Sequence, residues 1–109
     1  MRNAEGRPDH PAFDSLMGGA FNQDWKDDWG GVEEVLTAAL DGFPATRKSL
    51  LLELIEIEQT CSEGEVIALL EGMGSGFRPE VDAHTSAIGW IRHLIQRIRT
   101  LDEADRTAR

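Results

Sequence analysis

Residues 46–60 carry the pattern that most constrains what this chain can fold into. The apolar residues that recur there at intervals of three and four are Leu50, Leu54, Ile57 and Cys61, with Leu51 and Ile55 beside them. This spacing places the apolar side chains along one face of an α-helix. Glu53 and Glu56 share the opposite face. The segment is therefore predicted to form an amphipathic helix that buries one stripe against other elements.

Four further segments show helical spacing of apolar residues: 13–17, 32–40, 62–70 and 85–101. Ser62 and Glu65 have the spacing of a capping box, which marks a helix start. Thr85 or Ser86 is expected to begin the last helix. No segment alternates apolar and polar residues with the period of two that a strand requires. The sequence thus predicts an all-α, single-domain bundle of about five helices.

The length of 109 residues is that of one domain with one hydrophobic core. A flexible N-terminal arm is expected over residues 1–12, a helical domain over 13–101 and a frayed tail over 102–109. The core is expected to contain Leu50, Leu54, Ile57, Ile67, Leu70, Ile88, Ile91, Ile95 and Ile98.

The net charge is −9 at pH 7, and it is unevenly distributed. Residues 14–71 hold thirteen acidic side chains and three basic ones, whereas residues 72–109 hold five acidic and six basic ones. An acidic chain repels nucleic acid and anionic membrane surfaces, so neither is expected as a direct ligand. A basic protein is the better electrostatic partner. A solvated acidic surface that only keeps the protein soluble is the simpler alternative.

Cofactor and metal sites are not indicated. The glycines at 72, 74 and 76 lack the lysine that a phosphate-binding loop requires, and a single cysteine excludes a CxxC zinc cluster. His10, His84 and His93 share no ligand spacing, and no nucleophile is recognisable beside a base. No catalytic, cofactor or metal site is therefore predicted. The N-terminal segment has no apolar stretch typical of export, and with the lone Cys61 this favours the cytoplasm.

The most unusual segment is residues 18–29, which carries two tryptophans among acidic residues and runs into a loop predicted over residues 21–31. Gly18 and Gly19 are expected to end the first helix. Phe21 and Trp25 are expected to fold back onto the core, with Asp24 capping a turn or the next helix. Trp29 lies among carboxylates, an arrangement typical of the residues that dominate protein interfaces.

The same segment resembles a known family, the small helical immunity proteins of contact-dependent growth inhibition (CdiI type). The matching residues are Phe13, Leu16, Gly18-Gly19, Phe21, Asn22-Gln23-Asp24-Trp25, Glu33-Glu34-Val35-Leu36, the leucine-rich helix at 50–57, Gly74, Phe77, Pro79, Asp82 and Trp90-Ile91. The likeness covers roughly residues 13–101. Where the family has a histidine, this chain has Asn22, and the helix at 32 lacks the family's Thr-Pro start.

The resemblance implies that the chain binds and neutralises the C-terminal toxin domain of a related cell's CdiA effector. Such toxins are frequently cytosolic nucleases, which present a basic cleft to nucleic acid and would attract an acidic inhibitor. A pattern shared by members that answer different toxins serves the fold rather than specificity. The residues expected to serve the fold are Gly18, Gly19, Phe21, Gln23, Asp24 and Trp25. Those expected to contact the toxin are Asp27, Asp28, Trp29, Glu33, Glu34, Glu53 and Glu56.

Two other functions compete with this one. A non-enzymatic acidic helical adaptor that binds a basic protein would share the composition, and the gene immediately upstream distinguishes it from an immunity protein. A metal-dependent hydrolase would require a carboxylate cluster, and a divalent cation bound to the native state would then raise the stability.

Overall fold

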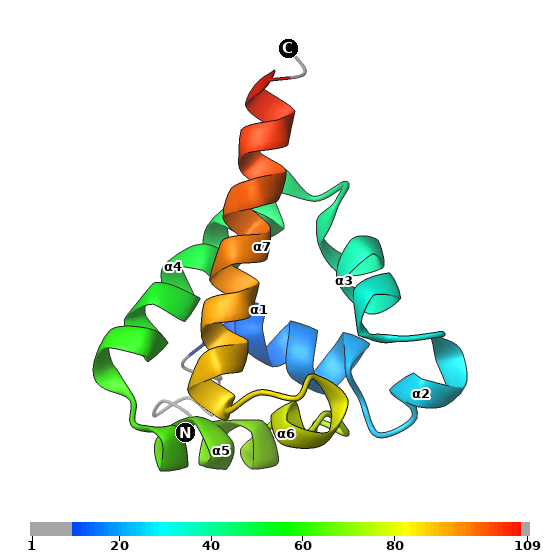
Figure 1. Ribbon diagram of the computed structural model, residues 1–109, viewed down its shortest axis with the longest axis vertical. Coiled ribbons are helices and arrows are strands. Elements are labelled where there is room, and N and C mark those ends of the chain that lie inside the picture. Colours follow the sequence, from blue (N-terminus) through cyan, green and yellow to red (C-terminus); the bar gives the residue numbers. More distant parts are fainter. Residues whose placement is uncertain (1–9, 108–109) are drawn as a thin grey trace.

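The computed structural model describes residues 10–107, and in that range the chain is helical with no strand (Figure 1). The elements are α1 (Pro11–Asp14), η1 (Ser15–Ala20), α2 (Trp25–Asp28), α3 (Val32–Leu40), α4 (Pro44–Thr60), α5 (Glu63–Gly72), α6 (Pro79–Asp82) and α7 (Ala87–Thr107). The predicted all-α fold is confirmed. The predicted helices correspond to α1 with η1, α3, α4, α5 and α7, to which the structure adds the one-turn helices α2 and α6.

Helix α7 is the central element (Figure 1). It packs most extensively against α4 and also contacts α5 and α6. In Figure 1, α3 lies on the side of α7 opposite α4, α1 runs across behind, and α5 and α6 cover one end. The C-terminal turns of α7 project beyond the other helices at the opposite end. Within residues 10–107 no helix combines the length and apolar character that crossing a membrane requires.

The core is one cluster to which almost every element contributes. Its residues are Phe13, Leu16, Met17, Phe21, Trp25, Val35, Leu36, Leu40, Leu50, Leu54, Ile57, Val66, Leu70, Phe77, Ala87, Trp90, Ile91, Leu94, Ile95 and Ile98. Of the predicted core residues, Ile88 is only partly buried and Ile67 is 39% exposed. The prediction for Ile67 is wrong because α5 lies at the edge of the bundle. Adjacent residues of a helix point about 100° apart, and it is Val66, not Ile67, that faces the core.

Several predicted boundaries differ from those observed. Gly18 and Gly19 do not end the first helix, because η1 continues through them to Ala20 as a π-helical turn. The last helix does not end near Leu101 but continues to Thr107, so the frayed tail predicted from 102 is wrong as far as the structure describes it. Of the predicted arm, residues 1–9 lie outside the described residues.

At three helix starts, a glutamate side chain accepts hydrogen bonds from backbone N–H groups that have no partner within the helix. The predicted capping box is present: Ser62 N donates to Glu65 and Glu65 N donates to the Ser62 hydroxyl. The hydrogen bond from Ser62 N–H lowers the pKa of Glu65 below 4.5, so this stabilisation is lost as the pH falls through that lowered value. At the other two starts the glutamate comes from a distant helix. Glu53 in α4 accepts from Ala12 N and Phe13 N at the start of α1, at 3.0 and 2.8 Å.

Glu63 does the same for α7, where it accepts from Ala87 N (2.8 Å) and Ile88 N (3.0 Å). Ser86, one of the two predicted first-turn residues, accepts from Gly89 N at 2.9 Å. A carboxylate at a helix N-terminus satisfies unpaired N–H groups and the positive end of the helix dipole. These contacts are structural uses of acidic side chains that helical periodicity alone does not reveal.

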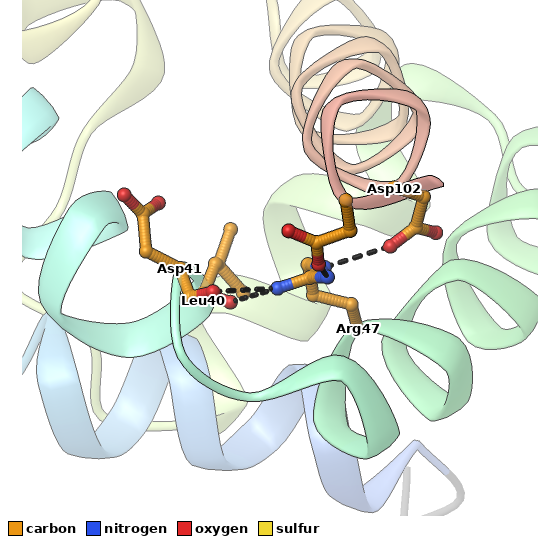
Figure 2. A network of polar contacts seen from close by, with 5 residues as sticks. Leu40, Asp41, Arg47 and Asp102 are labelled. Atoms are coloured by element: carbon orange, nitrogen blue, oxygen red, sulfur yellow. Dashed lines mark hydrogen bonds and ion pairs between the residues drawn. The ribbon is translucent and has the colours of Figure 1, made fainter. Parts of the chain in front are cut away.

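Among residues 10–107, Arg47 is the one charged residue that is buried, only 1% exposed (Figure 2). Its Nη1 donates to the carbonyl oxygens of Leu40 (2.7 Å) and Asp41 (2.9 Å), at the end of α3. Its Nε donates to Asp102 at 2.7 Å, and its Nη2 forms an ion pair with Asp105, both in the last turns of α7. The hydrogen bond with Asp102 is the main cause of a raised pKa, so Arg47 stays charged and its contribution to stability is constant across neutral pH.

Leu54→Ala should lower the free energy of unfolding by about 2–5 kcal/mol, because Leu54 is fully buried and truncation leaves a cavity. Leu52→Ala is the matched control, since Leu52 is 64% exposed on the same helix. Its cost should stay within about 0.5 kcal/mol. Urea denaturation of both variants measures the difference, and equal costs would contradict the assignment of the α4 core face.

Arg47→Met should cost about 2–4 kcal/mol, because two carbonyls and two carboxylates lose the donor that Arg47 supplies, and only the Leu40 carbonyl keeps another, Phe43 N at 3.2 Å. The lower part of that range reflects the aspartates, which are 38% and 49% exposed and recover hydration. Lys48→Met, at an exposed neighbouring position, is the control. Hydrogen exchange should also accelerate over residues 101–107 in the Arg47 variant alone. Unchanged protection there would show that Arg47 does not hold the end of α7.

Candidate partner-binding surface

The structure brings five of the seven predicted contact residues together where α2 meets α3. These five, called the acidic corner below, are Asp27, Asp28, Trp29, Glu33 and Glu34. All five side chains are exposed. In Figure 1, α2 lies at the outer edge of the molecule beside α3.

A cluster of aromatic rings fixes α2 to the core. Trp25 packs edge-on against Phe21 with ring centroids 5.3 Å apart, and Phe21 contacts Phe77 at 4.9 Å. Phe77 in turn lies 4.2 Å from the ring of Trp90 in α7. All four rings are buried, so the prediction that Phe21 and Trp25 fold back onto the core is confirmed.

Two glycines allow the backbone to approach closely around this cluster. A Cβ on Gly18 would lie 2.6 Å from the Met73 carbonyl oxygen, and a Cβ on Gly76 would lie 2.7 Å from the Asn22 carbonyl oxygen. Gly76 N also donates to the Phe21 carbonyl at 3.0 Å. Any side chain at these glycines would collide with backbone. The segment 73–76 and the turn before α2 therefore support each other.

The remaining residues of the predicted fold motif differ in what they do. Gly19 has open space around it, and Gln23 is exposed with no hydrogen bond from its side chain within the described range. Asp24 stands at the N-cap of α2, but its side chain makes no capping bond. Instead the Asn22 side chain accepts from Asp24 N at 2.9 Å. The cap expected from Asp24 is therefore wrong, because the asparagine two residues earlier turns the chain.

Lys26 joins α2 to α6. Its Nζ lies 2.8 Å from an Asp82 oxygen, and the other Asp82 oxygen accepts from Arg78 N at 2.8 Å. The Asp82 side chain is only 5% exposed, so α2 is tied to a nearly buried anchor. This contact was not predicted from the sequence, because 56 residues separate the partners and neither lies in a periodic pattern.

Within the acidic corner the carboxylates are not equivalent. Glu33 forms an ion pair with Arg97, and Glu34 accepts from Gly30 N at 2.9 Å, which caps the approach to α3. Asp27 and Asp28 make no ion pair with any residue that the structure describes. Trp29 follows them and is 36% exposed. The unpaired negative charge thus lies directly beside an accessible indole ring.

Glu53 and Glu56 do not belong to this surface. They lie on α4, which Figure 1 places on the side of α7 away from α2 and α3. Glu53 is half-buried and caps α1, with both of its oxygens accepting from backbone N–H groups, and its assignment as a partner contact stays a prediction. Glu56 is exposed and lies 3.5 Å from His10.

No group of three or more His, Cys, Asp or Glu side chains among residues 10–107 is arranged to hold a metal ion. The three histidines come from separate parts of the fold: His93 stacks on Trp90, and His84 lies in the turn before α7.

Comparison of this chain with protein-family models, with curated proteins and with solved structures finds no match in any of the three. The resemblance to the immunity proteins therefore depends on the sequence pattern itself, and its functional content is a proposal.

Trp25→Ala should mainly damage stability, by about 3–5 kcal/mol, because the ring is 4% exposed and holds α2 in the aromatic cluster. Trp29→Ala, four residues later, should leave the melting temperature nearly unchanged because the ring is partly exposed. Thermal unfolding followed by circular dichroism compares the two. If Trp25→Ala melts like the parent protein but loses partner binding, the structural role assigned to Trp25 is wrong.

Proposed function

We propose that this chain is a non-enzymatic immunity protein that binds the C-terminal toxin domain of a CdiA effector in the cytoplasm and neutralises it. The toxin is expected to be a basic nuclease. The observation that carries the proposal is the acidic corner, in which the unpaired Asp27 and Asp28 lie beside the accessible Trp29. It comes from the same segment whose Gln-Asp-Trp pattern resembles the family.

The chemistry of this corner suits a basic protein partner. An aromatic side chain that can be buried, flanked by charges that steer the approach, is typical of residues that dominate interface energetics. A standard interface buries on the order of 1,600 Å², more than this corner alone presents, so neighbouring surface must also take part. Neutralising a toxin requires a Kd of nanomolar order or tighter, about −12 kcal/mol.

The net charge of −9 supports fast association with a basic nuclease. Salt screens such steering, since the Debye length falls to roughly 8 Å at physiological ionic strength. Association should therefore slow as salt rises, while dissociation should respond less.

Charge reversal of Asp27→Lys with Asp28→Lys should reduce the association rate at low salt by at least about tenfold and weaken protection, because both carboxylates are exposed and unpaired. Surface plasmon resonance against an inactive form of the toxin domain encoded immediately upstream measures the rates. Survival of cells that express the active domain measures protection.

Asp41→Lys with Glu103→Lys is the matched control, because it makes the same change in net charge at exposed positions outside the corner. Equal, salt-dependent slowing by both double variants would show that only net charge acts. Parent-like kinetics of the Asp27/Asp28 variant would remove the corner from the interface. If the parent protein neither binds the toxin domain nor protects cells, the proposed function is wrong.

A further inference from the structure

A second surface feature lies between α5 and α6. It is a pocket of about 350 Å³. Its floor consists of the buried side chains Leu70, Phe77 and Pro79. Ile67, which the sequence placed in the core, instead stands at its edge and is 39% exposed. The apolar residue that the fold leaves outside the core therefore contributes to a pocket.

The rim of the same pocket carries Glu71 and Glu80, both exposed. Neither carboxylate forms an ion pair within the part of the chain that the structure describes. Arg78 is the one cation among the lining residues. An apolar floor below two unpaired carboxylates suits a side chain with an aliphatic stem and a positive end, which is how lysine and arginine cover apolar surface.

The larger cavity of about 690 Å³ between α3, α6 and α7 lacks this combination. Its two carboxylates are already paired, Glu33 with Arg97 and Asp82 with Lys26. A cation entering there would have to displace an existing ion pair. In the pocket between α5 and α6, a cation could approach Glu71 and Glu80 without displacing an ion pair of the described residues.

We propose that the α5–α6 pocket receives a lysine or arginine side chain of the toxin domain and extends its binding site from α2 across α6 to α5. This inference rests on the proposed function. Continuity of the surface supports it, because Lys26 in α2 is bonded to Asp82 in α6, and α6 forms one wall of the pocket. In Figure 1, α5, α6 and α2 follow one another along the same end of the molecule.

Isothermal titration calorimetry with the inactive toxin domain encoded upstream tests this assignment. Glu71→Gln with Glu80→Gln should raise the Kd about tenfold, since it removes the charge that the bound cation would meet. Arg78→Ala should change the Kd in the opposite direction, because it removes the like charge at the rim while keeping the backbone N–H bonded to Asp82. Ile67→Ala should weaken binding about threefold to tenfold through lost contact with the stem.

Two controls separate the pocket from general effects. Asp41→Asn with Glu103→Gln removes the same net charge elsewhere, and Leu52→Ala truncates an exposed apolar residue on α4, away from the pocket. Both should bind like the parent protein, and circular dichroism should show every variant folded.

The outcomes distinguish the two proposals. If the Glu71/Glu80 variant binds no more weakly than its control, or if Arg78→Ala weakens binding, the pocket assignment is overturned. The pocket assignment can fail while the proposed function stands: this is the result if the pocket variants contradict it but Asp27→Lys with Asp28→Lys still impairs binding. If the parent protein does not bind the toxin domain at all, both proposals fail together.

Discussion

The guanidinium of Arg47 is the contact through which three helices meet. The end of α3 leaves the carbonyls of Leu40 and Asp41 without helical partners, and Arg47 supplies both donors from the first turn of α4. The rest of its donor set reaches Asp102 and Asp105, so the last turns of α7 are held where the hydrophobic core has already ended. A buried charge is costly unless it is paired and hydrogen-bonded on every side, and Arg47 meets that condition. Arg47 therefore links the end of α3 and the start of α4 to the last turns of α7.

At the other end of the molecule, aromatic ring contacts rather than ion pairs connect the elements. Phe21, Trp25, Phe77 and Trp90 connect α2, the segment after α5 and the start of α7 through direct ring contacts. Four residues are too few for a helix to be stable alone, so α2 exists because Trp25 is buried and Lys26 is bonded to Asp82. Asp27 and Asp28 of the acidic corner therefore stand on a turn that a buried ring and an ion pair hold in place.

The sequence allowed the long helices and most of the core to be predicted, because those depend on local periodicity. The structure reproduces 32–40 without change, and the capping box at Ser62 and Glu65 is present. What could not be predicted depends on pairs distant in sequence. Nothing in the sequence around Arg47 indicates that its two aspartate partners lie 55 and 58 residues away. Glu53 looked like a solvated helix face, yet it caps a helix forty residues earlier. Ile67 is apolar and was therefore expected in the core. It is exposed because α5 lies at the periphery of the bundle.

The acidic character of the chain therefore has two origins that composition cannot separate. Glu53, Glu63 and Glu65 bind helix N-termini, and Asp82, Asp102 and Asp105 hold cations of the same chain. Such carboxylates contribute to the long-range field, but a partner that competed for their existing bonds would weaken contacts that hold the fold. The carboxylates that make neither an ion pair nor a helix-capping bond within the described residues carry no such cost: they are Asp14, Asp24, Asp27, Asp28, Asp41, Glu71, Glu80 and Glu103. Steering can draw on the whole charge, whereas short-range recognition can draw only on this unpaired subset. In the proposed binding site, Asp27 and Asp28 lie beside Trp29, and Glu71 and Glu80 line the α5–α6 pocket.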